Sequence, residues 1–191
     1  EEYLQELARE YERATMAIRR DLEVFYQRFA DNNGIVTLAE AKRMLDAGEL
    51  KEFRMTLEEF TAKAKDNADG RWTKQLDNVY FRTRVTRFDA LQIQIRHQAE
   101  MLAGSREQSM RELLGDIYTD TYHRTIFEVQ RGVGIGAGFA RIDPKGLEMV
   151  LNTEFAGSNW SKRIWGDRDK LVRELRTHLA QGFIRGDSVE R

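Results

Sequence analysis

The sequence predicts an all-α protein: an elongated multi-helix bundle followed by a smaller helical region at the C-terminal end. Apolar residues recur at spacings of three and four, which place them on one face of a helix. The only proline is Pro144, so no proline interrupts the helices predicted before it. Charged residues make up 33% of the chain, a share that favours long, solvated helices over a β-sandwich.

The longest apolar pattern opens the chain and predicts one helix over residues 2–30. Its residues form a heptad seam with one additional step of four: Leu4, Leu7, Tyr11, Ala14, Ile18, Leu22, Phe25 and Phe29. The segment Asp31-Asn32-Asn33-Gly34 should end the helix, since Gly34 suits a left-handed cap. The seam has two interpretations. It packs on helices of its own chain, or it packs on another subunit and makes a homo-oligomer.

The pattern continues to residue 131 with short connections. Residues 37–40 (TLAE) are a capping box that predicts a short helix to about Leu45. Further helices are expected over residues 50–64, 72–79, 85–102 and 114–129. The breaks between them are expected at residues 46–48, 66–70 and 104–105, where Gly, Asp, Asn or Ser interrupt the apolar spacing.

Alternating glycines mark the best candidate for a domain boundary: Gly132, Gly134, Gly136 and Gly138. A phosphate-binding P-loop requires a Lys-Ser or Lys-Thr pair after the glycines, and a dinucleotide loop requires a βαβ unit. Neither feature is present, so the stretch is interpreted as a connector. We therefore predict a helical domain over residues 1–131. Residues 132–191 then hold the connector, a short helix beginning at Asp143-Pro144, and the start of a second domain.

Four arginines cluster near one predicted helix start together with Phe81 and Phe88: Arg82, Arg84, Arg87 and Arg96. Such a cluster can contact the phosphates of double-stranded DNA. Alternatively, the arginines pair with nearby acids. The net charge of −1 gives the chain no overall positive field that would favour DNA.

No catalytic or metal-binding arrangement is recognisable in the sequence. The chain has no cysteine and therefore no disulfide and no thiol nucleophile. His97, His123 and His178 lack partners at metal-ligand spacing, so each is expected on the surface or as a hydrogen-bonded core residue. No serine lies in a G-x-S-x-G motif. No apolar run approaches the ~20 residues of a membrane span. We predict no enzyme, no cofactor and no membrane contact.

Residues 159–188 contain two tryptophans, Trp160 and Trp165, followed by a helix marked by Leu171 and Leu175. Their spacing predicts that one tryptophan anchors the connector while the other packs on the leucine helix. Arg163 is expected to pair with Asp167 or Asp169 at that helix start. A new helix-start signal at Asp187-Ser188 lies close to the last residue, and the chain does not begin with Met. Both observations favour a fragment of a longer protein.

Three blocks of the chain carry a family resemblance: LKEFRMTLEEF (residues 50–60), DIYTDTYHRTIFEVQRGVGIG (116–136) and NWSKRIWGDRDKLVRELRTHLAQGFIRGDS (159–188). They resemble the minor capsid, or head morphogenesis, proteins of tailed bacteriophages and prophages of Gram-positive bacteria. The last block is the most specific, with an S-x-R-I-W segment, a leucine helix and a G-x-S ending. Its positions here are Trp160, Ser161, Arg163, Ile164, Trp165, Leu171, Leu175, Gly186 and Ser188.

The resemblance implies a structural protein of the virion head, present in the host cytoplasm during assembly. Family members lie near the portal vertex, contact portal or capsid proteins, and support head assembly and DNA packaging or ejection. Some bind DNA without sequence preference, so a non-specific DNA-binding module is the alternative function. A third interpretation is the N-terminal fragment of a phage toxin or ADP-ribosyltransferase fusion, since some relatives carry such a C-terminal domain. The family motif continues past the point at which this chain stops, so the second domain is expected to be truncated.

Overall fold

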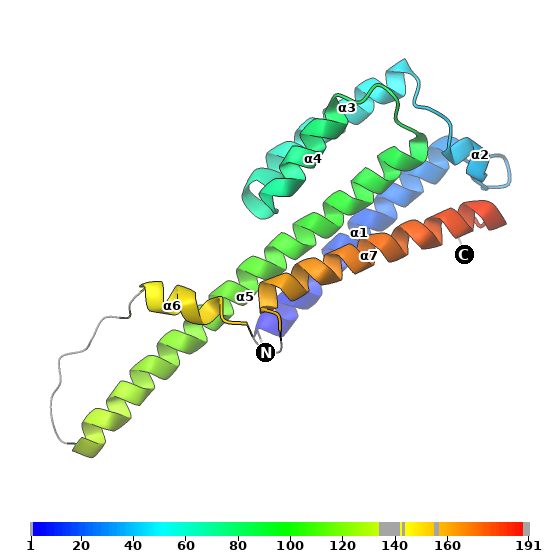
Figure 1. Cartoon of the computed structure of the whole chain (residues 1–191). Coiled ribbons are helices and arrows are strands. Elements are labelled where there is room, and N and C mark those ends of the chain that lie inside the picture. Colours follow the sequence, from blue (N-terminus) through cyan, green and yellow to red (C-terminus); the bar gives the residue numbers. More distant parts are fainter. Residues whose placement is uncertain (1, 134–141, 143, 155–156, 189–191) are drawn as a thin grey trace. The chain divides into compact units, whose positions relative to one another are not determined.

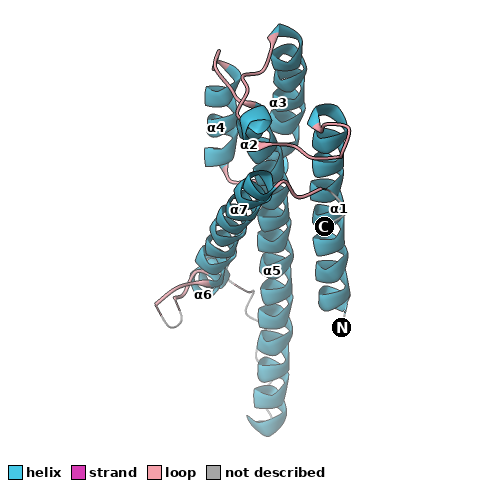
Figure 2. Cartoon of the chain, turned by 90° about the vertical axis from the view of Figure 1, so that its right-hand side faces the viewer, coloured by secondary structure: helices cyan, strands magenta, loops and turns pink. Residues whose placement is uncertain are grey.

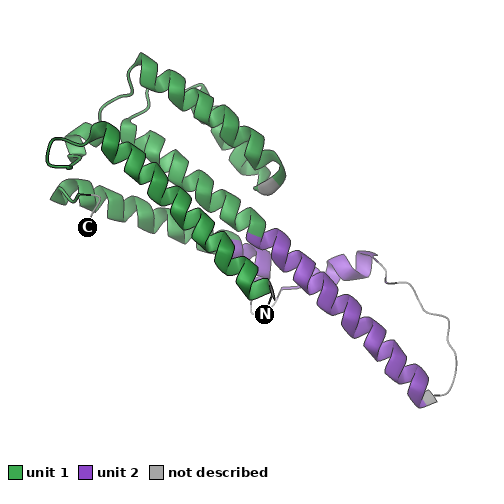
Figure 3. Cartoon of the chain, turned by 180° about the vertical axis from the view of Figure 1, so that it is seen from behind, with its two compact units in different colours: residues 1–105, 165–191 green, residues 106–164 purple. Residues whose placement is uncertain are grey.

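The computed structural model describes residues 2–133, 142, 144–154 and 157–188. These residues form seven α-helices and no β-strand, so the all-α prediction is confirmed (Figures 1 and 2). The chain divides into two compact units (Figure 3). Unit 1 comprises residues 1–105 and 165–191, and unit 2 comprises residues 106–164.

Helix α1 (Glu2–Phe29) matches the helix predicted from the heptad seam. The Asp31 carboxylate ends it by accepting hydrogen bonds from the backbone N–H groups of Asn33 (2.9 Å) and Ile35 (3.0 Å). The second half of the seam packs on the chain's own core: Ile18, Leu22, Phe25 and Phe29. In the first half, Leu4 remains 65% exposed. The packing of the seam on its own chain is thus confirmed for the second half, while pairing with another subunit stays a prediction for the first.

Helix α2 (Leu38–Ala41) is shorter than predicted. The Thr37 hydroxyl accepts the N–H of Glu40 as expected, but the helix ends four residues before Leu45. The segment that follows pairs instead with the chain before α5. The N–H of Leu45 donates to the carbonyl of Val85 (2.9 Å), and Met44 and Thr86 form an isolated antiparallel bridge. Long-range backbone hydrogen bonds have replaced the last turn of the predicted helix.

Helix α3 (Ala47–Asn67) begins at a segment predicted to be a break. Asp46 is its N-cap, and Asp46 and Glu49 form a reciprocal capping box. The Asp46 carboxylate accepts the N–H of Glu49 (2.8 Å), and the Glu49 carboxylate accepts the N–H of Asp46 (3.0 Å). An acid followed three residues later by Glu therefore starts a helix here, despite the glycine inside the first turn.

Helix α4 (Gly70–Tyr80) lies side by side with α3 and begins at the N-cap Asp69 (Figure 1). Unit 1 contains two buried clusters, and α3, α4 and the first part of α5 form the larger one. The largest residues of this cluster are Phe53, Leu57, Phe60, Trp72 and Leu76. The second cluster joins α1, α5 and α7 through Phe25, Val36, Leu91, Ile95 and Phe183. The core of unit 1 therefore lies on two sides of α5.

Helix α5 (Arg87–Val133) is one continuous helix of 47 residues, about 70 Å long at 1.5 Å per residue. The predicted break at Gly104-Ser105 is wrong. Ala99, Leu102 and Ala103, just before it, are buried. A glycine inside a helix costs only about 1 kcal/mol, so packing on the preceding turns is sufficient to carry the helix through this point.

Helix α6 (Pro144–Leu151) lies where the Asp143-Pro144 signal predicted it, although Asp143 itself is outside the described residues. Helix α7 (Trp160–Arg185) begins earlier than the leucine pattern indicated. Most of the glycine connector falls outside the described residues, and the domain boundary proposed there stays a prediction. Among the helices that the structure describes, none combines the length and the apolar character that a membrane crossing demands.

Candidate partner-binding groove

The G-x-S ending of the family-like motif folds back onto the end of α1. Gly186 takes a left-handed conformation (φ 74°). The N–H groups of Gly186 and Asp187 both donate to the carbonyl of Gly182, at 2.9 and 3.0 Å. After this cap the chain runs antiparallel to Ile35, with which Ser188 forms an isolated bridge. The motif glycine thus provides the turn that brings Ser188 to the loop after α1.

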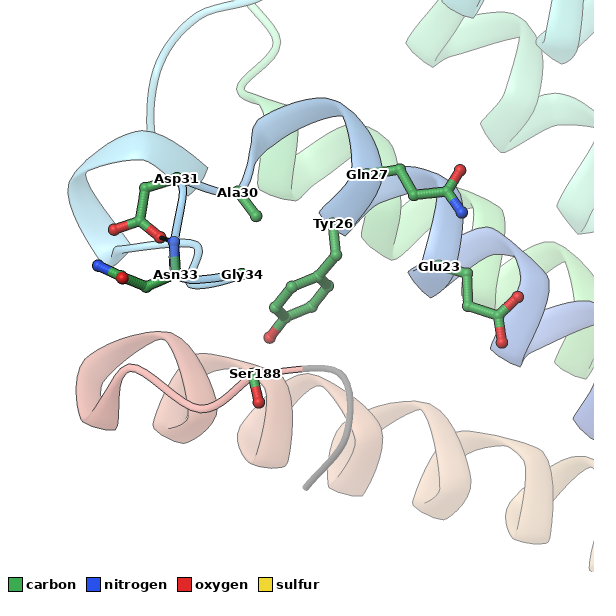
Figure 4. Close-up of a pocket in the computed structure, with 8 residues that line it drawn as sticks. All are labelled: Glu23, Tyr26, Gln27, Ala30, Asp31, Asn33, Gly34 and Ser188. Atoms are coloured by element: carbon green, nitrogen blue, oxygen red, sulfur yellow. Dashed lines mark hydrogen bonds between the residues drawn. The ribbon is translucent and has the colours of Figure 1, made fainter.

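An open groove of about 530 Å³ lies at this junction (Figure 4). Its lining residues come from the end of α1, the loop after it and the segment after α7: Glu23, Tyr26, Gln27, Ala30, Asp31, Asn33, Gly34 and Ser188. The Tyr26 side chain extends from α1 towards the C-terminal segment, and its hydroxyl donates to the carbonyl of Asp187 (3.3 Å). This bond joins residues 161 positions apart in the sequence.

The groove is acidic and rich in hydrogen-bond acceptors. The backbone N–H groups of Ile35 and Asn33 lower the pKa of Asp31, so its carboxylate stays charged at neutral pH. Burial, together with the nearby Asp187 charge, raises the pKa of Tyr26, so the phenol stays protonated. The lining side chains include two carboxylates, two amides, one phenol and one hydroxyl. Such a set suits recognition of a partner segment rich in donors, such as lysine, arginine or backbone N–H groups.

The first motif residues hold unit 2 together. The Trp160 indole N–H donates to the carbonyl of Leu151 at the end of α6 (2.7 Å), and the Arg111 guanidinium lies 5.8 Å from the Trp160 ring centroid. The Ser161 hydroxyl donates to the carboxylate of Glu107 on α5. Trp160 therefore joins the start of α7 to the end of α6. The connector that one of the two tryptophans was predicted to anchor lies mostly outside the described residues, so that anchoring stays a prediction.

The next motif residues lie on the same helix. Ile164 is buried, Arg163 is exposed, and Trp165 is half-buried with the Arg168 guanidinium 4.9 Å from its ring centroid. Asp169, one of the two acids expected to pair with Arg163, forms an ion pair with Arg168 (2.9 Å). The pairing of Arg163 stays a prediction. The expectation that a new helix starts at these acids is wrong, because α7 already begins at Trp160.

The leucine pattern marks the side of α7 that packs in unit 1. Leu175 and Leu179 contact the cluster around Phe25 and Phe183, and Leu171 is half-buried on the same helix. Most of the motif residues thus have structural contacts of their own. Of the nine positions named from the motif, only Ser188 lines the groove directly.

The four arginines do not form one open basic surface. Arg87 pairs with Glu49 (2.8 Å) and with Glu40, and Arg96 pairs with Glu100 (3.1 Å). Arg82 and Arg84 are exposed in the connection between α4 and α5. The alternative that these arginines pair with nearby acids is therefore confirmed for Arg87 and Arg96.

Two polar residues on α5, His97 and Glu100, are buried, and the sequence pattern did not single out Glu100. Glu100 is fully buried and accepts from Arg96 and from Arg168 of α7 (2.6 Å). His97 is buried and hydrogen-bonded, one of the two outcomes expected for it. The sequence holds one signal for Glu100: it lies between Ala99 and Leu102, two residues of the apolar face predicted for this helix. A carboxylate buried there needs a cationic partner.

Among the described residues, no group of three or more His, Cys, Asp or Glu side chains is arranged to hold a metal ion. Comparisons with protein-family models, with curated proteins and with solved structures find no match to this chain.

Proposed function

We propose that this protein is a non-catalytic structural component of the head of a tailed phage or prophage. It acts at or near the portal in head assembly and in DNA packaging or ejection, and it resides in the host cytoplasm until it joins the virion. The resemblance of the three sequence blocks supports this proposal. The all-α fold agrees with it, since long packed helices offer extended surfaces for docking.

The groove beside Ser188 is the observation that carries the proposal. The most specific motif ends in the turn that builds this groove, and two carboxylates give it a negative charge. We infer that a donor-rich segment of a portal or capsid protein binds there. Like charges placed opposite one another at an interface weaken binding strongly, so a cation introduced into the groove should exclude such a segment.

The test is co-expression of this chain with the portal protein encoded by the same phage or prophage genome, followed by gel filtration. The expected result is co-elution that is lost on Glu23→Lys, because a cation in the groove repels the donor-rich segment. Glu12→Lys is the matched control, since Glu12 is an exposed acid on the same helix outside the groove.

Purified virions provide the second measurement. Mass spectrometry of virions from the induced host should detect this chain in few copies, with cryo-electron microscopy density at the portal vertex. Absence from the virions, together with no co-elution of the wild-type chain, would overturn the proposal. Retention on duplex DNA that weakens steeply with salt would favour the DNA-binding alternative instead.

A further inference from the structure

A second cavity in unit 1 lies among α1, α3 and α5 and shares no lining residue with the groove. Its volume is about 210 Å³. Half of its lining residues are apolar, among them Phe25, Phe29, Phe53 and Leu91, and the other half are polar or charged. Benzene fits in a cavity of roughly 150 Å³, so the volume here is sufficient for an aromatic ring with a short polar arm.

The charged residues at the cavity do not balance. Three acids and two arginines line it: Asp21, Glu49, Glu52, Arg28 and Arg87. Arg28 pairs with Glu52 across α1 and α3 (2.6 Å), and Arg87 pairs with Glu49 (2.8 Å). Both lining arginines are therefore engaged by other acids, and neither pairs with the Asp21 carboxylate.

Asp21 is half-buried, and within the described part of the chain its carboxylate accepts one hydrogen bond, from the Gln98 amide (3.3 Å), and forms no ion pair. Burial raises the pKa of Asp21, against the opposing effects of that hydrogen bond and of the Arg20 charge. A desolvated carboxylate gains from a nearby cation, because the cation replaces the hydration that burial removed.

The aromatic wall already accepts cations. The guanidinium of Arg87 lies 4.1 Å from the centroid of the Phe29 ring, and that of Arg28 lies 5.6 Å from the same ring. The electron-rich faces of such rings attract cations, most strongly where water is excluded.

We propose that this cavity binds a small organic cation, with an ammonium group beside Asp21 and an aromatic or branched apolar body against Phe25, Phe53 and Leu91. This binding site is independent of the head-assembly function. Its ligand is recognised by volume, by aromatic contact and by one carboxylate, so neutral and anionic molecules of the same shape should bind less well.

The experiment uses three probes of one shape on the full chain: benzylammonium, benzyl alcohol and benzoate. Titrations are followed by the methyl NMR signals of Leu91 and Val24, which line the cavity. Benzylammonium should bind about tenfold more tightly than benzyl alcohol, as expected for one added charge-assisted hydrogen bond. Benzoate should bind least well.

Asp21→Asn keeps the shape of the side chain and removes its charge. It should reduce benzylammonium to the affinity of benzyl alcohol and leave benzyl alcohol unchanged. Asp77→Asn is the matched control, since Asp77 is an exposed acid on α4 outside the cavity. Retained binding of benzyl alcohol shows that the Asp21→Asn cavity is intact.

Gln94→Lys provides a second, independent variant, because Gln94 lines the cavity on α5. The new ammonium should occupy the place of the ligand's ammonium and abolish the preference for benzylammonium. Equal affinity for the three probes, a preference that survives Asp21→Asn, or no shift of the Leu91 methyl signals at millimolar probe would each overturn the proposal.

Discussion

The indole N–H of Trp72 on α4 donates a 3.1 Å hydrogen bond to Nδ1 of His97 on α5. The imidazole ring is stacked on Phe60 of α3, with centroids 3.9 Å apart and an interplanar angle of 8°. Because Nδ1 accepts this bond, the neutral imidazole carries its proton on Nε2. The side chain of His97 thus connects three helices of unit 1. It is only 2% exposed, and this burial disfavours the charged form of the imidazole.

His97 should make the protein less stable in acid. Burial, and to a smaller extent the Lys63 charge, lower the pKa of His97 from 6.5 to about 4. Below pH 6.5 the imidazole of His97 therefore binds a proton in the unfolded chain, whereas in the folded chain it binds one only near pH 4. The contribution of the neutral imidazole to the free energy of unfolding is complete above pH 6.5. It is lost as the pH falls to about 4, a decrease of about 3 kcal/mol in total. Urea denaturation at a series of pH values measures it.

The variant His97→Gln separates this contribution from other titrating groups. Its free energy of unfolding should vary less with pH across the same window, and its stability relative to wild type should improve as the pH falls. His178→Gln is the matched control, since it removes a histidine that is exposed on α7. Parallel curves for wild type and His97→Gln would show that His97 does not titrate in this way.

Loss of the Glu100 carboxylate should destabilise the protein. Its fully buried carboxylate bonds with Arg168, whose side chain is only 13% exposed. Removing one member of a buried ion pair typically costs about 3–5 kcal/mol, and here it leaves the Arg168 guanidinium with the exposed Asp169. We expect Glu100→Ala to lower the free energy of unfolding by about that amount, as measured in urea.

The double variant Glu100→Met with Arg168→Met should recover much of the loss. Apolar residues of similar volume can replace a buried pair at little cost, and the remaining Arg96 is partly exposed and can reach water. A double-mutant cycle gives the coupling energy of the pair. A double variant as unstable as Glu100→Ala alone would mean that packing at Glu100, rather than charge, is responsible.

Trp160→Phe should loosen α6. The change keeps an aromatic ring and removes the 2.7 Å bond to the carbonyl of Leu151, a loss of about 1 kcal/mol. Amide hydrogen exchange in α6 should accelerate accordingly. Trp165→Phe is the matched control on the same helix and should leave α6 exchange unchanged. If amide exchange in α6 were unchanged in Trp160→Phe, the hydrogen bond from Trp160 to Leu151 would not stabilise α6.

Two glycines of α7 and its cap should respond to alanine in opposite directions. Gly186→Ala must hold a side chain at φ 74°, which costs about 1–2 kcal/mol. The new Cβ would lie 3.5 Å from Ile35 Cγ2, an ordinary contact, so the cost comes from the backbone. Gly166→Ala meets nothing within 4 Å and should stabilise by about 0.5–1 kcal/mol. Thermal unfolding of both variants tests the difference in sign.

Local sequence pattern was sufficient for the helix class and for most of the helices. Apolar spacing predicted α1 within one residue at its end, and Pro144 placed the start of α6. These features depend on residues a few positions apart, so the side chains that decide them are neighbours in the sequence. Even the misread start of α3 had a local signal, the capping box of Asp46 and Glu49.

Only the tertiary structure decided the features that join distant segments. The short α2, the unbroken α5 and the pairing of Arg87 with Glu49 each depend on contacts with residues far away in the chain. The groove is the clearest case, because Tyr26 and Ser188 meet only after α7 has packed beside α1. The free energy of packing outweighs local helix propensities, which are about 1 kcal/mol per residue. The spacing of apolar residues along the sequence does not specify which helices will pack together.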